Sequence, residues 1–169
     1  MKSAKRHWLR PLGVGASLAS VFSLGAHALA GSTSTNFTVS ATVVAACVTS
    51  ATNMNFGNYT ASSGSPDNTT STVSVTCSNN DAYTIALNAG NSGNVAARTM
   101  LNGANTLGYG VYTTSGYSTI WGDGTSGTST VSGTGNGTAQ NYTAYGQVPT
   151  AEYAAAGSYS DTLTATVTF

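Results

Sequence analysis

The residue types that most often carry chemistry are scarce in this chain of 169 residues. Its histidines, His7 and His27, and its lysines, Lys2 and Lys5, all fall within the first thirty positions. Beyond residue 30 the sequence therefore lacks an imidazole base, a histidine-activated nucleophile, a histidine-based metal site and a Schiff-base lysine. The many glycines stand beside no lysine, so a phosphate-cradling loop is not indicated either.

Carboxylates leave one enzymatic alternative, because glycoside hydrolysis needs only two carboxyl groups. Asp123, Glu152 and Asp161 are the candidates. Asp123 lies in a Gly-Asp-Gly sequence, where aspartate commonly serves turn geometry. Asp161 lies in a segment with strand-like alternation. We therefore predict that the protein is not an enzyme and needs no cofactor and no metal.

The first thirty residues indicate export. An apolar stretch at 12–24 leads to Ala28-Leu29-Ala30, the small-x-small pattern of a secretory signal peptide, with cleavage predicted after Ala30. A run of about 13 apolar residues is too short to span a bilayer, which needs about 20. The basic residues that precede this run are Lys2, Lys5, Arg6 and Arg10. We expect an exported chain that begins at residue 31 and has no stable membrane insertion.

Charge is nearly absent from the predicted mature chain. Arg98 is its one cation, set against five carboxylates, so the net charge is −4. Such a surface cannot neutralise phosphates, which argues against nucleic-acid binding and against binding to anionic membranes. The five carboxylates are Asp67, Asp81, Asp123, Glu152 and Asp161.

The two cysteines, Cys47 and Cys77, fall in the part of the chain that is exported. A pair in an oxidising compartment is most simply a disulfide, and a redox or metal role would need a CxxC spacing or histidines. The bond would close a loop with 29 residues between the cysteines. On the chain-entropy model this stabilises the fold by about 3–4 kcal/mol.

Strand-like alternation recurs along the mature chain, which is rich in Thr, Ser, Gly, Asn and Val. Apolar residues at every second position predict strands that cover one side of a shared core. Frequent turn clusters between them favour a β-sandwich or barrel. The tract 122–137 is expected to be a long mobile loop, or a weak edge strand around Val131. The alternating segments are 37–47, 71–77, 83–87, 107–111 and 159–169, and the turn clusters are 78–81, 88–94, 102–105 and 122–137.

Several motifs occur in a recognisable order. The chain resembles the spore coat protein U-like family, which includes the pilin subunits of archaic chaperone–usher pili, over essentially its whole mature length. The long Gly/Ser/Thr tract after Trp121 is a departure from the family pattern. The motifs are Ala46-Cys47-Val48, Val75-Thr76-Cys77, a segment from Leu107 with Tyr109 and Tyr112, Trp121-Gly122-Asp123-Gly124, and an ending from Gly157 with Tyr159 and Asp161.

The resemblance implies an all-β, immunoglobulin-like β-sandwich at 45–169 that is incomplete and lacks its last strand. A periplasmic chaperone would fill the resulting groove first, and the N-terminal extension of another subunit, at 31–44, would fill it in the fibre after passage through an outer-membrane usher. This is strand addition to an open sheet edge. The donor face would be Phe37, Val39, Ala41 and Val43, and the acceptor groove would be lined by Leu163, Ala165, Val167 and Phe169.

The expected function is therefore a structural subunit of a bacterial surface fibre, supporting adhesion and biofilm formation as a homopolymer. One alternative is a secreted spore-coat or matrix protein whose N-terminal strand completes its own sandwich. Another is a carbohydrate-binding module that stacks sugar rings on Tyr109, Tyr112 and Trp121. Aromatic residues of this kind are also good strand residues whose polar tips reach solvent or a partner.

Overall fold

The computed structural model describes residues 30–169, so the predicted signal peptide lies outside the described residues except for Ala30. The chain divides after Ser40 into two units. The described part of the first unit, residues 30–40, contains no helix or strand. The second unit, Ala41–Phe169, contains the whole β-structure and is the domain treated below.

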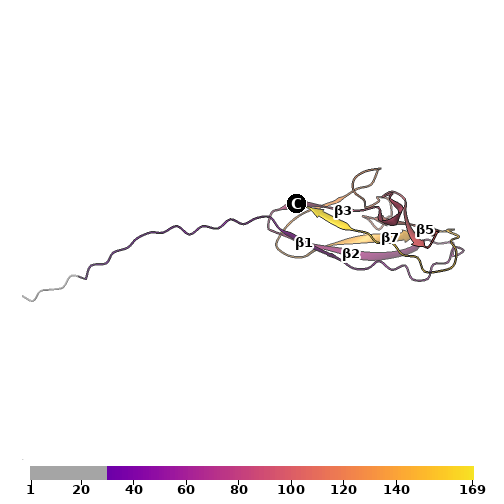
Figure 1. The fold of residues 1–169 in the computed structure, drawn as a ribbon, viewed down its shortest axis with the longest axis horizontal. Helices are drawn as coiled ribbons and strands as arrows, with labels where there is room; N and C mark the ends of the chain where they lie inside the picture. The colour runs from indigo at the N-terminus through magenta and orange to yellow at the C-terminus, as the bar shows by residue number, and fades with distance from the viewer. Residues whose placement is uncertain (1–29) are drawn as a thin grey trace, which may run out of the picture. The chain divides into compact units, whose positions relative to one another are not determined.

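One layer of the domain is a five-stranded antiparallel sheet in the order β1-β2-β7-β5-β4. The long strands β2 and β7 form its centre and lie side by side (Figure 1). Each shows alternate buried and exposed residues, as expected where only one face of a sheet covers a core. The strands are β1 Cys47–Ala51, β2 Asp67–Cys77, β4 Arg98–Asn102, β5 Asn105–Tyr112 and β7 Gln140–Val148.

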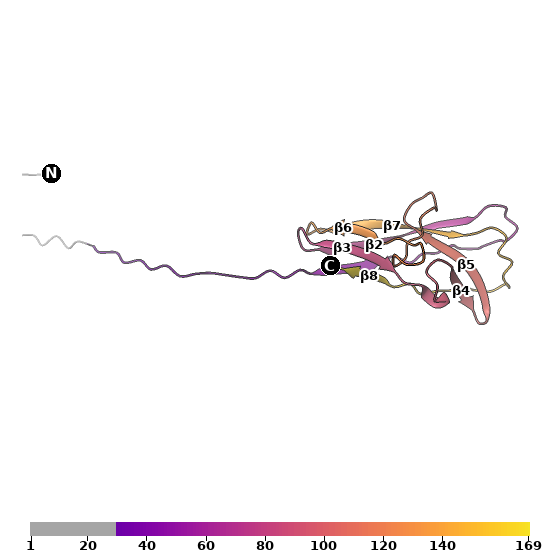
Figure 2. The same cartoon turned by 90° about the horizontal axis from the view of Figure 1, so that it is seen from above.

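The second layer is a three-stranded antiparallel sheet in the order β6-β3-β8. Its strands are β3 Ala82–Leu87, β6 Val131–Thr134 and β8 Ala165–Thr168, and a 3-10 turn, η1, spans Gly90–Ser92. The C-terminus lies beside the start of β1 in both views of the molecule (Figures 1 and 2). Both sheets bury their inward side chains in a common core, as an all-β sandwich requires.

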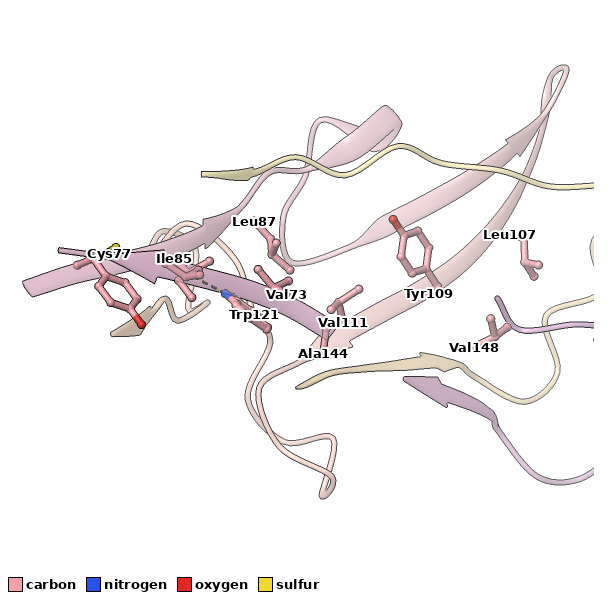
Figure 3. Packing of buried hydrophobic residues seen from close by; sticks show 12 residues of the cluster. Val73, Cys77, Ile85, Leu87, Leu107, Tyr109, Val111, Trp121, Ala144 and Val148 are labelled. Carbon is pink, nitrogen blue, oxygen red and sulfur yellow. Dashed lines mark hydrogen bonds between the residues drawn. The ribbon is translucent and has the colours of Figure 1, made fainter. Parts of the chain in front are cut away.

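Trp121 joins the two layers at the centre of the core. Its side chain is fully buried, and its indole N–H donates to the carbonyl of Ile85 in β3 over 3.0 Å (Figure 3). Its backbone N–H donates to the carbonyl of Val111 in β5 over 2.8 Å. The tryptophan motif thus fixes the spacing of the sheets. The other core side chains shown in Figure 3 include Val73, Leu87, Leu107, Tyr109, Ala144 and Val148.

The predicted strands at 71–77, 83–87 and 107–111 are confirmed within β2, β3 and β5. The weak edge strand around Val131 is also confirmed, as β6. The prediction of one continuous strand at 159–169 is wrong, because only Ala165–Thr168 pairs as a strand. Upstream of β8 the backbone is held by the loop after β3 instead: Asn88 Oδ1 accepts from the Thr164 N–H, and the Asn88 N–H donates to the Thr164 carbonyl.

An open groove between the two sheets as the candidate functional site

The sandwich is open along one side, where each sheet ends in an edge with a free hydrogen-bonding face. β1 pairs only with β2, and β8 pairs only with β3. Between these edges lies a groove of about 620 Å³. One wall is the segment 51–56 that follows β1, and the other is the segment 159–165 that leads into β8. Core residues of both sheets form its floor, among them Val73, Leu87 and Val111.

The groove continues toward the end of the domain opposite the disulfide. A second hollow of about 760 Å³ shares Met54, Phe56, Met100 and Tyr159 with the first and extends to Glu152. The shared residues place the two hollows next to each other. Apolar side chains such as Met54, Phe56 and Met100 lie along the groove among polar ones such as Asn55 and Asp161, which suits an extended partner with one apolar face.

The structure places the predicted acceptor residues in three environments. Leu163 and Ala165 line the groove. Val167 is not among the lining residues; it pairs with Ile85 and packs against the core. Phe169 is 56 % exposed one residue beyond β8. The groove is therefore built from the residues before β8 as much as from the strand itself.

The predicted donor residues lie in the extended N-terminal segment, where residues 30–46 have no strand pairing. Phe37, Val39 and Val43 are 85 %, 82 % and 89 % exposed, and Ala41 is exposed as well. Apolar side chains of this size are ordinarily buried. Their alternation and exposure are the properties of a strand that lacks its sheet.

A polar pair, Tyr109 and Asp161, lies in the groove lining. The phenol of Tyr109 donates to Asp161 Oδ2 over 2.6 Å, and Asp161 Oδ1 accepts from the backbone N–H of Asn91 at 2.8 Å and of Thr162 at 2.7 Å. Burial, and then the hydrogen bond to the carboxylate, raise the pKa of Tyr109 well above its ordinary value. The aspartate thus ties β5 and η1 to the wall before β8.

Arg98, the one cation among residues 30–169, is buried beside this pair, with 2 % of its surface exposed. Its Nε and Nη2 donate to the Asn88 carbonyl at 2.9 and 2.8 Å, and Nη2 also reaches the Leu87 carbonyl at 3.3 Å. Burial lowers the pKa of the guanidinium, and the nearby Tyr109, Asp161 and Asp123 oppose that effect. The arginine therefore anchors the end of β3 internally and is not available to an external ligand.

The cysteines form the predicted disulfide. Cys47 and Cys77 are bonded, and they are Cα partners where β1 begins and β2 ends. The bond therefore fixes the point at which the N-terminal segment leaves the domain. Within the described residues, no disulfide ties the segment before Cys47 to the domain.

The sequence matches the Spore Coat Protein U domain family over residues 33–166. The chain belongs to this family. Among solved structures it is similar to a chain in the crystal structure of the CsuC–CsuE chaperone–tip adhesion subunit pre-assembly complex from archaic chaperone–usher Csu pili of Acinetobacter baumannii. The identity is 31 % and the TM-score is 0.55, over 76 % of this chain. The match covers 40 % of that chain, so this protein spans about two fifths of its length. A comparison with curated proteins gives no match.

The remaining motif residues of this Spore Coat Protein U chain have structural contacts. Asp123 accepts from the Thr125 N–H and hydroxyl at 2.9 and 2.7 Å, and these bonds, the hydroxyl first, lower the pKa of its exposed carboxyl. Gly122 packs so closely on Thr128 that a Cβ would overlap it. Tyr159 lines the groove and donates to the Ala155 carbonyl over 2.7 Å. Tyr112 lies on the outer face of the five-stranded sheet.

Two of the three aromatics considered for sugar stacking are inside the domain. Trp121 is fully buried and Tyr109 is 8 % exposed. Since a sugar ring needs an open aromatic face, the hypothesis of a platform made from Tyr109, Tyr112 and Trp121 is wrong in this form. The burial of Tyr109 agrees with its place on the apolar side of the alternating segment 107–111, whereas alternation does not reveal which way a loop residue such as Trp121 turns.

Sequence reasoning missed one wall of the groove. Met54 and Phe56 follow β1 with one asparagine, Asn55, between them, and Met100 comes from β4, a strand that was not predicted. The alternation of Met54 and Phe56 was a usable signal.

Among residues 30–169 there is no helix long and apolar enough to cross a membrane. Within the same range no group of three acidic, histidine or cysteine side chains could hold a metal ion.

Proposed function

We propose that this protein is a structural subunit of an archaic chaperone–usher pilus that polymerises by donor-strand exchange. It is exported to the periplasm, held there by a chaperone, passed to an outer-membrane usher and displayed at the cell surface, where the fibre supports adhesion and biofilm formation. The observation that carries the proposal is the open groove between the free edges of β1 and β8. The family match and the likeness to a chain of a chaperone–subunit complex support it.

The N-terminal segment has the right length and pattern for this groove. Residues 31–46 make 16 residues, which span roughly 53 Å when extended at about 3.3 Å per residue. Its odd-numbered residues from Phe37 to Val43 are apolar and would face inward, while its backbone would pair with the free edges of β1 and β8. The inserted strand would bury two edges that otherwise invite uncontrolled pairing.

The direction of insertion decides between a closed dimer and an open fibre. The extension leaves its domain at Cys47, next to the C-terminus (Figure 2). If it entered a neighbour at that same end, the neighbour's extension would emerge beside the first groove, and two copies would close on each other. Entry at the opposite end, beside Tyr159 and Glu152, sets every copy in the same orientation and leaves the chain of subunits open. The donor strand would then run antiparallel to β8.

The second candidate, a coat or matrix protein that fills its own groove, requires a reversal immediately before Cys47. The residues available for that reversal are Val44, Ala45 and Ala46. They include none of the Gly, Pro, Asn or Asp residues that tight turns favour. The Ala46 N–H also donates to Ser78 Oγ over 3.0 Å, which holds the backbone in line with β1. These features favour donation to another copy.

Introducing a charged side chain on either face of the donor segment tests the proposal. In cells that supply the chaperone and usher, Val39→Arg should abolish fibres seen by electron microscopy, because a long charged side chain would replace a compact apolar one that must be buried in the groove. Ser40→Arg, on the other face of the same strand, should leave fibres intact. Leu163→Arg in the groove wall and Thr164→Arg beside it form the matching pair on the acceptor side. Normal fibres from Val39→Arg and Leu163→Arg would overturn the proposal.

A further inference from the structure

Three tyrosines gather on the outer face of the five-stranded sheet, away from the groove. Tyr112 of β5 and Tyr145 of β7 are direct cross-strand partners. Tyr117, from the loop after β5, packs edge-on against both, with ring centroids 5.5 Å from Tyr112 and 6.5 Å from Tyr145. The interplanar angles are 87° and 86°. All three rings are half-buried, so each retains exposed surface.

The hydroxyl groups of this tyrosine cluster, defined as Tyr112, Tyr117 and Tyr145, distinguish it from most other tyrosines of the chain. The phenols of Tyr59, Tyr83, Tyr109, Tyr142 and Tyr159 are all hydrogen-bonded to protein groups. Within the described residues no protein group bonds to the three hydroxyls of the cluster. Three phenols that converge on one patch with free donors and acceptors are available to a ligand.

The backbone of Tyr117 is held in an unfavourable conformation. Its φ is 51°, in the left-handed region that bulky residues avoid. Two hydrogen bonds close the loop around it, from the Thr113 N–H to the Thr119 carbonyl and from the Tyr117 N–H to the Thr114 carbonyl. Strain of this kind persists only where the surroundings impose it, and it concentrates at functional sites. Here the strained residue supplies the central ring of the cluster.

The strand residues around the cluster are uncharged, and the carboxylate of Glu152 lies farther along β5, against Gly108. The outward residues of β2, β5 and β7 are all threonine, serine, asparagine, glutamine, tyrosine or glycine. Beside Tyr145, Gln147 Nε2 donates to Asn68 Oδ1 over 3.0 Å, which leaves further amide donors and acceptors directed outward. A face whose strand residues are neutral hydrogen-bonding groups and aromatic rings is complementary to a neutral ligand that is rich in hydroxyl groups.

Part of this arrangement has a structural explanation. The ring of Tyr112 lies across Gly110, so closely that a Cβ there would overlap the ring, and it covers backbone that the glycine leaves open. That explanation accounts for Tyr112 alone. It requires neither the strained Tyr117 nor the free hydroxyl of Tyr145.

We infer that the tyrosine cluster binds a neutral carbohydrate, with sugar rings packed against Tyr117 and Tyr145 and sugar hydroxyls bonded to the phenols and to the Asn68–Gln147 amide pair. The site is independent of the groove, so every copy in a fibre would present it. It corrects the earlier sugar-platform hypothesis by replacing the two buried aromatics with residues of the outer face. A polymer of such sites would bind a polysaccharide at many points, with the gain in avidity that multiple linked sites provide.

The test is calorimetric titration of the assembled full chain with cellohexaose, mannohexaose and chitohexaose, and with anionic oligogalacturonate as the mismatched ligand. We expect binding of at least one neutral hexasaccharide and none of the anionic one. Tyr145→Ala should weaken that binding about tenfold, which corresponds to about 1.4 kcal/mol. Tyr145→Phe should give a smaller loss because it keeps the ring. Tyr153→Ala, at an exposed tyrosine outside the cluster, should have no effect.

Several outcomes would overturn the inference. These are the absence of binding to all three neutral sugars, equal binding by Tyr145→Ala, or equal binding of oligogalacturonate. A change in lateral association of fibres in Tyr145→Ala, with sugar binding unaltered, would assign the face to a second copy of the chain instead. Unchanged melting temperatures of both alanine variants would establish that any loss is local to the site.

Discussion

The phenol of Tyr109 donates to the carboxylate of Asp161 over 2.6 Å, and this single bond joins β5 to the wall of the groove that precedes β8. Because Asp161 also holds the N–H of Asn91, the bond couples three segments that are distant in sequence. The groove keeps its shape although no strand pairs with residues 161–164. An incomplete sandwich needs such supports, because a missing strand cannot contribute its share of hydrogen bonds.

Removing the Tyr109 hydroxyl should therefore destabilise the domain. In Tyr109→Phe the carboxylate of Asp161 loses one donor while still enclosed in the groove, and we expect a loss of about 1–3 kcal/mol in the free energy of unfolding. Urea denaturation followed by Trp121 fluorescence measures it. Tyr153→Phe, at an exposed phenol, is the matched control and should be neutral. Equal stability of Tyr109→Phe and the parent would show that the bond does not support the groove.

Alkaline pH should weaken the fold through its buried tyrosines. Burial, with the hydrogen bond to Tyr142, raises the pKa of Tyr83 to about 12. An unfolded tyrosine titrates near 10, so the unfolded chain loses protons first. The stabilisation is complete below pH about 10 and is lost as the pH rises toward about 12. Tyr83→Phe should flatten the stability profile over that interval, measured as urea midpoints at successive pH values. A profile as steep as the parent's would contradict this assignment.

Arg98 should protect the folded chain from trypsin. It is the only lysine or arginine after residue 30, and its buried guanidinium is bonded to Asn88 and Leu87. We expect the folded mature chain to survive trypsin and to be cut once on unfolding, into two fragments seen by mass spectrometry. Ser62→Lys, in an exposed turn, should be cut while folded. Rapid cleavage at Arg98 in the folded parent would show that β4 opens readily.

Loss of the disulfide should lower the stability of the domain. The double change Cys47→Ala, Cys77→Ala should reduce the free energy of unfolding by about 3–4 kcal/mol on the chain-entropy model. Because the bond joins the first residue of β1 to the last residue of β2, we also expect β1 to fray first. Hydrogen exchange at the amides of residues 47–51 reports that fraying. Unchanged stability and unchanged exchange would mean that β1 is held by its ladder alone.

Much of the fold was predictable from period-two alternation. The segments of Val73 and Val75, of Ile85 and Leu87, and of Leu107 to Val111 are strands because one of their faces must be buried. The central strand β7 was missed because two of its inward positions carry the small residues Ala144 and Gly146. Larger apolar residues at those positions would give a clearer alternation. The tract after Trp121 contains the predicted edge strand because Gly133 lets β6 approach Tyr83 and Tyr142 closely.

The candidate site was only partly predictable. The alternation of the N-terminal segment identifies a strand, but sequence alone does not state which sheet it completes. The stretch before β8 alternates like a strand, but side chains supply its hydrogen bonds in place of a neighbouring strand. Asn88 Oδ1 accepts from the Thr164 N–H, and Asp161 Oδ1 accepts from the Asn91 N–H. Met54 and Met100 reach the groove from segments far apart in sequence. Contacts of that kind depend on the topology and not on any local pattern.

The most direct test of donor-strand exchange combines two defective chains. One lacks residues 31–44 and so has a groove without a donor, and the other carries Leu163→Arg and so has a donor without a working groove. Neither alone should form fibres. Co-expressed with the chaperone, they should form a one-to-one heterodimer that stops at two subunits, as measured by native mass spectrometry. Failure to pair, or fibres formed by either chain alone, would contradict the account.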